Sequence, residues 1–213
     1  MRRFATVLGV VATLVTLACG GVVVAAGAPE QAPPAAPVPP WQRVTTAVGS
    51  FEVPPGSTGW TVREPDQVVY YADASGDPVV GVAGPAVLDD GYCRQATGAS
   101  NRGFAGLTGP HPGPLRQVNV REARRWRTAV AGRPTTDGRT TRLVLADGAA
   151  AVHTSALVRP APAGPCQPER VALDHVSVTG PTGVVTLVVV RDLGPDAASA
   201  SEVDRLLRSL RVF

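Results

Sequence analysis

Residues 170–191 read RVALDHVSVTGPTGVVTLVVVR, and this stretch decides the fold. β-Branched residues are abundant on both sides of its centre, which favours two strands. The Gly-Pro-Thr-Gly segment at residues 180–183 is typical of a hairpin turn. The second strand, residues 184–191, is so apolar that we expect it at the centre of a sheet. Alternation along the first strand puts four side chains on one face: Val171, Leu173, His175 and Ser177.

Further strands and two helices are expected on either side of this hairpin. The apolar spacing of residues 117–131 and 198–210 predicts two amphipathic helices. Gly132 is placed to end the first, and Ser199 or Ser201 fits the N-cap of the second. This order predicts an α+β fold with two main helices packed on a mostly antiparallel sheet. The remaining strands are expected at residues 51–53, 60–62, 68–72, 78–83, 140–145 and 150–158.

The N-terminus has the pattern of an export segment. Arg2 and Arg3 precede residues 4–28, which carry no charged side chain, and such a cationic start stays on the cytoplasmic side of the membrane. A cleaved signal peptide, a retained anchor and a lipoprotein modified at Cys19 all remain open. A membrane span needs ~20 apolar residues, so the length favours an anchor, with cleavage close behind. Each alternative places the following domain outside the cytoplasmic membrane.

A proline-rich linker follows the apolar segment. Residues 29–40 contain six prolines, and such chains form semi-rigid, extended spacers. An unstructured stub left by signal cleavage is the alternative. We therefore expect three parts: a signal peptide or membrane anchor at residues 1–28, a Pro/Ala-rich linker at 29–44 and one α+β domain at 45–213.

The charge balance argues against nucleic acid as a partner. All basic residues other than histidine are arginine, and the formal net charge of the chain is +3. The charge is near +1 once Arg2 and Arg3 are set aside, which is too small for a field that would attract a polyanion. No zinc-finger, helix-turn-helix or RNA-binding motif is present either.

Two cysteines lie in the part expected to be exported. Cys93 ends the turn LDDGYC at residues 88–93, and Cys166 follows a proline-rich loop. An even pair outside the cytoplasm usually oxidises, so we expect a Cys93–Cys166 disulfide. It would close a loop of about 70 residues and stabilise the fold by roughly 4 kcal/mol. The alternative is a thiol nucleophile at Cys93 that uses one of the three histidines as base: His111, His153 or His175.

The other candidate sites have simpler structural interpretations. Histidines and cysteines lack paired metal-ligand spacing, so no metal and no cofactor are expected. The glycines of residues 100–109 do not follow phosphate-loop spacing, and we expect them to allow close backbone packing near the disulfide. The adjacent Asp89 and Asp90 suit a turn. His175 is expected to be a packed histidine. One helix face carries a candidate interaction surface for anionic lipid or wall polymer, formed by Arg121, Arg124 and Arg125. A solvated helix face is the favoured interpretation, because Glu122 and neighbouring acids reduce its positive charge.

A set of dispersed residues resembles a known family. F-x-V-P followed by Gly-Trp, a Gly-Tyr-Cys turn, S-x-R-x-x-x-G, the Trp-bearing helix, a second Pro-Cys and a terminal L-x-S-L helix occur in order over most of residues 45–213. This pattern is similar to an uncharacterised domain family of actinobacterial membrane-anchored proteins, a domain of unknown function; Gly103 departs from it, where alanine is expected. The residues that carry the resemblance are Phe51, Val53, Pro54, Gly59, Trp60, Gly91, Cys93, Ser100, Arg102, Gly106, Trp126, Cys166, Leu207, Ser209 and Leu210.

The resemblance implies two cysteines in matching places and one membrane segment before the domain, and it implies no activity. The architecture also resembles the PsbP-like α/β/α sandwich of several exported bacterial lipoproteins, which is an analogy of fold alone. We therefore expect a membrane-tethered, non-catalytic binding or accessory module in the cell envelope. Its partners would be the membrane, through the N-terminal segment, and an envelope protein or ligand. The alternatives are secretion after cleavage and an exported hydrolase or thiol enzyme using Cys93 with a histidine.

Overall fold

A computed structural model describes residues 40–93, 100–133, 138–161, 166–194 and 197–213. The predictions for the segment 1–28, for Cys19 and for the linker up to residue 39 lie outside these residues. Among the residues described, no helix is long and apolar enough to cross a membrane. The first strand, β1 (Gln42–Thr45), begins three residues before the predicted start of the domain.

The predicted hairpin is present at the centre of the fold. Strands β9 (Val171–Gly180) and β10 (Gly183–Asp192) pair antiparallel along their whole length, with Gly183 opposite Gly180. Every residue of β10 from Val184 to Val190 is buried. Because β10 lies between β9 and a strand from the N-terminal half, the predicted central position is confirmed.

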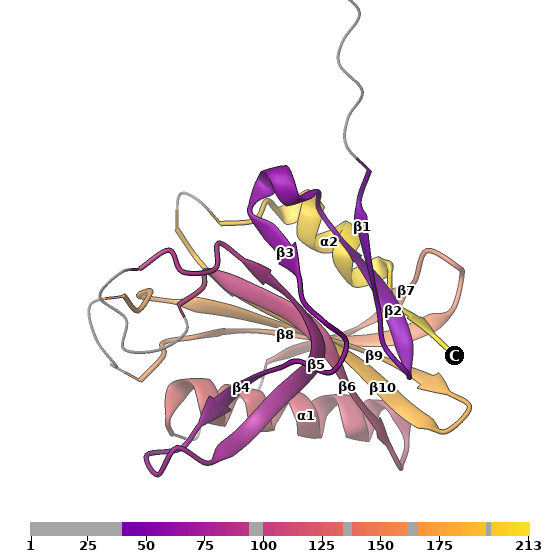
Figure 1. The fold of residues 1–213 in the computed structure, drawn as a ribbon. Helices are drawn as coiled ribbons and strands as arrows, with labels where there is room; N and C mark the ends of the chain where they lie inside the picture. The colour runs from indigo at the N-terminus through magenta and orange to yellow at the C-terminus, as the bar shows by residue number, and fades with distance from the viewer. Residues whose placement is uncertain (1–39, 94–99, 134–137, 162–165, 195–196) are drawn as a thin grey trace, which may run out of the picture. The chain divides into compact units, whose positions relative to one another are not determined.

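An eight-stranded antiparallel sheet is built around this hairpin (Figure 1). Its order is β3–β5–β6–β10–β9–β8–β7, and the short strand β4 pairs with the first half of β5. The two ends of β5 therefore bind different neighbours, with β4 on the first half and β3 on the second. The other strands of this sheet are β3 (Trp60–Val62), β4 (Val68–Ala72), β5 (Pro78–Leu88), β6 (Gly103–His111), β7 (Arg139–Val144) and β8 (Ala150–Val158).

Strand β6 was not predicted as a strand, although it pairs with both β5 and β10. Glycine weakens a strand pattern in the sequence because it adds no side chain and much backbone entropy. A Cβ atom on Gly106 would lie 2.6 Å from the side chain of Val82, and one on Gly103 would lie 2.6 Å from the carbonyl oxygen of Val190. The glycines do allow close packing, as expected, but they do so inside the sheet.

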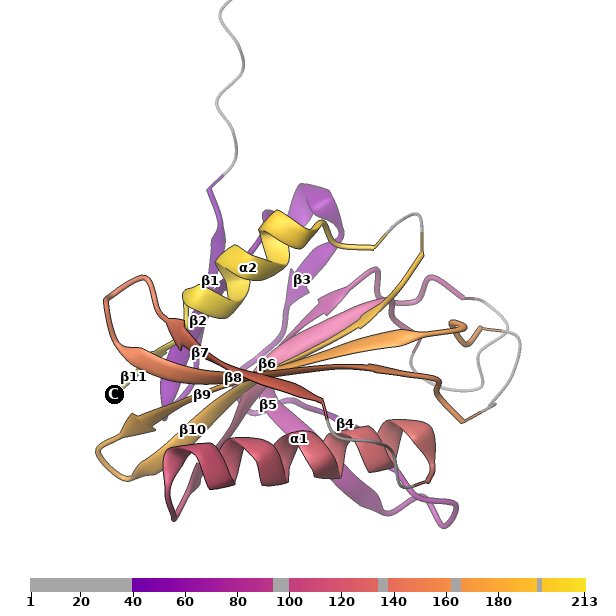
Figure 2. The same ribbon diagram turned by 180° about the vertical axis from the view of Figure 1, so that it is seen from behind.

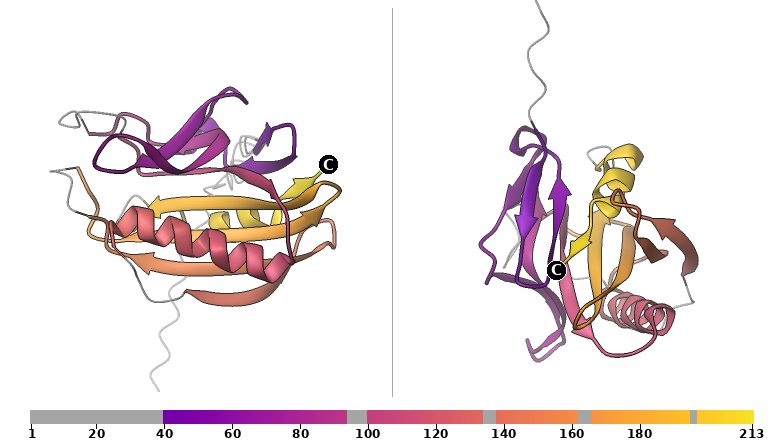
Figure 3. Two further views of the ribbon diagram at one scale, coloured as in Figure 1. Left: turned by 90° about the horizontal axis from the view of Figure 1, so that it is seen from below. Right: turned by 90° about the vertical axis from the view of Figure 1, so that its right-hand side faces the viewer.

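The two faces of the large sheet carry different layers (Figure 2). Helix α1 (Leu115–Ala131) packs on one face, against β8 and β9 (Figure 3). The other face carries α2 (Ala200–Arg208) and a small sheet in the order β1–β2–β11. The strands β2 (Gly49–Val53) and β11 (Arg211–Val212) complete that sheet. The fold is thus α+β, with a mostly antiparallel sheet and two packed helices, as the sequence predicted.

Each face has its own apolar core. The core under α1 is centred on Phe104, Trp126 and Leu173, and the core under α2 on Phe51, Leu187 and Leu206. Gly132 ends α1 in the left-handed conformation with φ of 62°. Ser199, rather than Ser201, caps α2 through a reciprocal capping box with Glu202. The strand β11 after α2 was not expected, since two residues carry no detectable alternation.

Candidate ligand-binding site

The two cysteines form a disulfide that ties the turn after β5 to the chain before β9. Their Cα atoms lie 5.9 Å apart, and 73 residues separate them in the sequence. The hydroxyl of Tyr92 donates to the carbonyl oxygen of Cys166. The backbone nitrogen of Cys93 donates to Oγ of Ser100 at 3.2 Å. With both sulfurs bonded to each other, Cys93 has no thiolate to act as a nucleophile.

The three histidines occupy different environments. His111 lies at the end of β6, on the side of the sheet that α1 covers. His153, on β8, faces the opposite side, where its Nε2 lies 2.8 Å from Oδ1 of Asp174. Arg191 approaches the second oxygen of Asp174 at 3.8 Å. His175 is 1% exposed and packs edge-on against Trp126, with ring centroids 6.2 Å apart. His175 is therefore the packed histidine that was expected.

Burial shifts the pKa values of two residues of the central hairpin, His175 on β9 and Asp192 at the end of β10. It lowers the pKa of His175 to about 3; Asp174 opposes this shift, and Arg127 and His153 add to it. Burial raises the pKa of Asp192 to about 6, although Arg102 opposes that change. His175 is therefore neutral in the folded protein at pH 7, whereas Asp192 becomes mainly protonated only below about pH 6.

These shifts predict how stability depends on pH. Between pH 6.5 and 3 the unfolded chain protonates His175 and the folded chain does not, so the free energy of unfolding falls as pH falls, by up to about 1.4 kcal/mol per pH unit from this group. Asp192 acts in the opposite sense below pH 6, because the folded state binds its proton more tightly. Chemical denaturation of the wild type and of His175→Gln over this range isolates the histidine contribution. Parallel stability curves for the two proteins would contradict a neutral, buried His175.

A buried asparagine joins α1 to the sheet. Nδ2 of Asn119, a fully buried residue, lies 3.1 Å from the carbonyl oxygen of Val152, 3.0 Å from that of His175 and 2.9 Å from Oγ of Ser177. Its Oδ1 accepts from the hydroxyl of Thr154. Such a satisfied network fixes the position of α1 along β8 and β9. Asn119 was not identified from the sequence, because the helical spacing of the apolar residues gives no signal for a buried amide.

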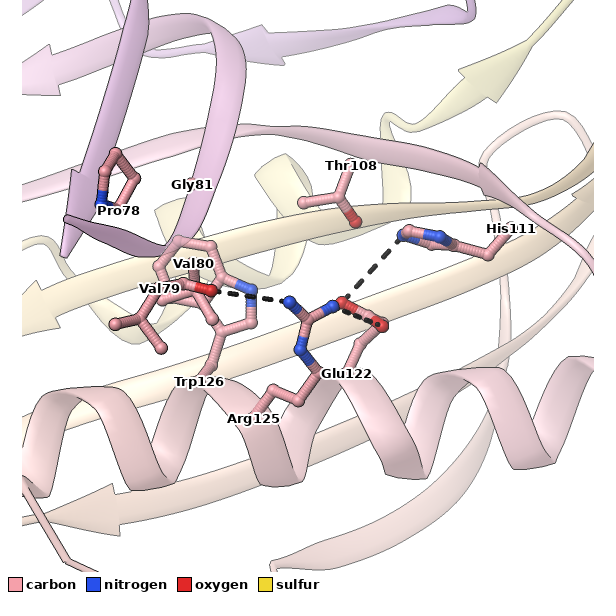
Figure 4. Close-up of a pocket in the computed structure, with 9 residues that line it drawn as sticks. All are labelled: Pro78, Val79, Val80, Gly81, Thr108, His111, Glu122, Arg125 and Trp126. Atoms are coloured by element: carbon pink, nitrogen blue, oxygen red, sulfur yellow. Dashed lines mark hydrogen bonds and ion pairs between the residues drawn. The ribbon is translucent and has the colours of Figure 1, made fainter. Parts of the chain in front are cut away.

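A cavity of about 160 Å³ lies beside this helix, between α1 and the strands β5 and β6 (Figure 4). Pro78 to Gly81 form its β5 wall, Thr108 and His111 come from β6, and α1 supplies the rest. Glu122, Arg125 and Trp126 lie on α1 at the spacing that keeps them on neighbouring turns. The cavity is thus formed by β5, β6 and α1, and these three elements are held in place by the apolar cores of the sheet.

The polar part of the cavity is centred on Glu122, whose side chain is 4% exposed. Nη1 of Arg125 lies 3.4 Å from Oε1 of this carboxylate, and Nε of Arg121 lies 3.7 Å from it. Nε2 of His111 lies 3.9 Å from Oε2, which is too far for a direct hydrogen bond. Nη2 of Arg125 also points to the carbonyl oxygen of Val79, at 3.4 Å. A buried carboxylate with cationic neighbours is thereby held at the cavity wall.

Two polar atoms of the cavity wall are buried without a hydrogen-bond partner among the described residues. They are Oγ1 of Thr108 and Nε2 of His111. Buried polar groups are nearly always satisfied, so each such atom needs an explanation. Both side chains point into the same space as the carboxylate of Glu122 (Figure 4). The arrangement can bind a polar group there. Among the described residues that line the cavity, one carries a carboxylate and none is serine or cysteine.

The candidate arginine surface is only partly what the sequence suggested. Arg121, Arg124 and Arg125 are all exposed on α1. Glu122, which was expected to reduce the positive charge of that surface, faces the sheet and is buried. The outer face of α1 also has a shallow hollow lined by Arg116, Gln117, Val120, Arg121 and Arg124.

The sequence identified neither Thr108 nor Glu122 as site residues. The only available signal was the position of Glu122, the one acidic residue of α1, three residues after Asn119 on the buried side. Asp89 and Asp90 lie in the turn before the disulfide, as expected, where they approach Arg102 and Arg63. Within the described part of the chain, no group of three potential ligands could hold a metal ion.

Comparison with known proteins gives one family. Residues 34–213 match a family described as a domain of unknown function, DUF8017. No curated protein and no solved structure matches the chain.

Proposed function

The chain belongs to the DUF8017 family, and from that premise we propose that it is a membrane-tethered, extracytoplasmic module that binds a component of the bacterial cell envelope without catalysis. The observation that carries this proposal is the disulfide between Cys93 and Cys166. Disulfides persist in oxidising compartments and are rare in the cytosol. The export pattern of residues 1–28 supports the same location, with secretion after cleavage as the alternative.

The binding role is supported by the cavity under β5 and β6. It has an apolar wall and a few convergent polar groups, as small-molecule sites do, and its volume of about 160 Å³ is smaller than that of a drug-sized pocket. Arg121, Arg124 and Arg125 remain a candidate surface for an envelope partner, because their guanidinium groups are exposed on one helix. We propose no cofactor and no nucleic-acid partner. Helices on both faces of the sheet support a PsbP-like architecture.

An exported enzyme is the second candidate, and one observation favours keeping it. The imidazole of His153 is oriented by the buried carboxylate of Asp174, as in many general bases. The version that used Cys93 as nucleophile would require reduction of the disulfide first.

An activity screen separates the two functions. We expect the purified protein to release no product from esters, peptides, glycosides or phosphoesters above the level found with His153→Ala, His175→Ala or Cys93→Ser. Turnover that the wild type shows and that His153→Ala removes, or that appears only after reduction of the disulfide and that Cys93→Ser removes, would replace the binding module by the exported enzyme. His175→Ala controls for lost packing, since that ring is buried away from solvent.

A further inference from the structure

We propose that the cavity between α1 and strands β5 and β6 binds a neutral, hydroxyl-bearing ligand the size of one sugar ring. This inference rests on the binding function proposed above and names the ligand class of that site. Its starting point is the pair of unpartnered atoms, Oγ1 of Thr108 and Nε2 of His111, beside the buried carboxylate of Glu122.

The hydrogen-bonding roles of the three groups select a hydroxyl. An ionised glutamate only accepts, whereas a threonine hydroxyl and a neutral imidazole nitrogen can donate or accept according to the partner. A ligand hydroxyl can donate to Glu122 and accept from His111 at the same time. The 3.9 Å between Nε2 of His111 and Oε2 of Glu122 leaves such an oxygen room to contact both atoms. A second hydroxyl on the same ligand would satisfy Thr108.

The charges around the cavity select against ionic ligands. The guanidinium groups of Arg121 and Arg125, within 4 Å of Glu122, already neutralise its carboxylate and repel a ligand cation. A ligand carboxylate cannot donate a hydrogen bond to Glu122, so it would leave this acceptor without the partner that a hydroxyl supplies. We assign Arg125 a positioning role, because it holds Glu122 and also the carbonyl oxygen of Val79.

The size and the apolar wall select a compact ring. The volume of about 160 Å³ is similar to that of an apolar cavity of ~150 Å³ known to accept benzene, so one six-membered ring fits, and the outer hydroxyls of a sugar would extend past the rim. Val80 and Trp126 are buried and supply an apolar side, while Pro78 and Val79 are exposed at the rim. A sugar ring has the matching character, with C–H groups on its faces and hydroxyls on its edge. A free sugar and the terminal ring of a glycan present the same hydroxyls and C–H faces to the cavity, so both are candidate sources of the ligand.

Binding to defined probes tests this proposal. The full chain, in a sugar-free zwitterionic detergent if it remains membrane-bound, is titrated with D-glucose, D-galactose, D-mannose and myo-inositol, and with acetate and methylammonium as charged probes. Nuclear magnetic resonance of the Trp126 indole and the His111 ring reports the site directly. We expect saturable shifts at both with at least one neutral probe and with neither ion. Comparison of glucose with maltose separates a free sugar from a glycan end.

The matched variants are Thr108→Val and Thr61→Val. Valine keeps the shape of threonine and removes its hydroxyl, and Thr61 is an exposed residue of β3 outside the cavity. We expect Thr108→Val to raise the Kd about tenfold, the effect of one lost hydrogen bond of about 1.4 kcal/mol, and Thr61→Val to leave the Kd unchanged.

Three results would overturn the inference: no saturable binding of any neutral probe, tighter binding of acetate or methylammonium, or an unchanged Kd for Thr108→Val. None of them alters the oxidation state of the cysteines or the result of the activity screen. Failure of this ligand class is thus distinguishable from failure of the proposed function.

Discussion

Replacement of both Cys93 and Cys166 by alanine is expected to lower the free energy of unfolding by about 4 kcal/mol. The disulfide closes a loop with a sequence separation of 73 residues, and the chain entropy that such a closure removes from the unfolded state has this size. The measurement is denaturant unfolding of the oxidised wild type and of the double variant. The double variant is used because a single substitution would leave a free thiol.

Reduction of the wild type under native conditions serves as the control for the substitutions themselves. It should produce the same loss as the double variant, because both remove the same cross-link. A loss below about 1 kcal/mol in the two experiments would show that the disulfide contributes little to the fold.

Replacement of Trp126 by alanine should cost about 4 kcal/mol, which is the range for a fully buried large aromatic side chain. Trp126 is 1% exposed and contacts three rings, with centroid separations of 6.1 Å to Tyr71, 6.0 Å to Phe104 and 6.2 Å to His175. The substitution removes this aromatic centre from the core under α1. Denaturant unfolding measures the loss, at a pH near 7 so that His175 stays neutral.

Trp126→Phe is the graded control. It keeps an aromatic ring in the core and should cost about 2 kcal/mol. Because Trp126 also forms the apolar wall of the cavity, the alanine variant should lose binding of the neutral probes even where it remains folded. Equal stability of the alanine and phenylalanine variants would contradict the importance of the ring contacts.

The strands with strong alternation and the two helices were predictable from the sequence. The hairpin of β9 and β10 was predicted within one residue at each of its outer ends, because its β-branched residues and its turn signal agree. The faces of β9 were also correct, since Leu173 enters the core under α1 and Val176 the core under α2. Local pattern and burial coincide in this part of the chain.

The inner strand β6 and the order of the strands were not predictable in the same way. Four glycines or prolines in Gly103–His111 obscure the strand pattern, and only the tertiary fit of Gly106 against Val82 explains them. The pairing of β6 with β10 joins segments about 80 residues apart. A single sequence contains no local signal for such a contact.

The cavity was missed for a related reason. Thr108 and His111 come from the unpredicted strand, and Glu122 comes from a helix whose arginines gave it the appearance of a surface residue. Their convergence depends on how α1 lies across the sheet, which the buried contacts of Asn119 determine. The two cysteines, in contrast, were identified by counting alone, because the rule that pairs them needs no knowledge of the fold.

The most direct test of the central claim, an exported domain closed by a disulfide, is the intact mass of the protein. The protein is isolated from its native cell envelope and alkylated under denaturing conditions without reductant. We predict no added alkyl group on Cys93 or Cys166, and the same mass will show whether residues 1–28 are retained. Alkylation of both cysteines would contradict the extracytoplasmic, disulfide-closed module and would make Cys93 the first residue to test for catalysis.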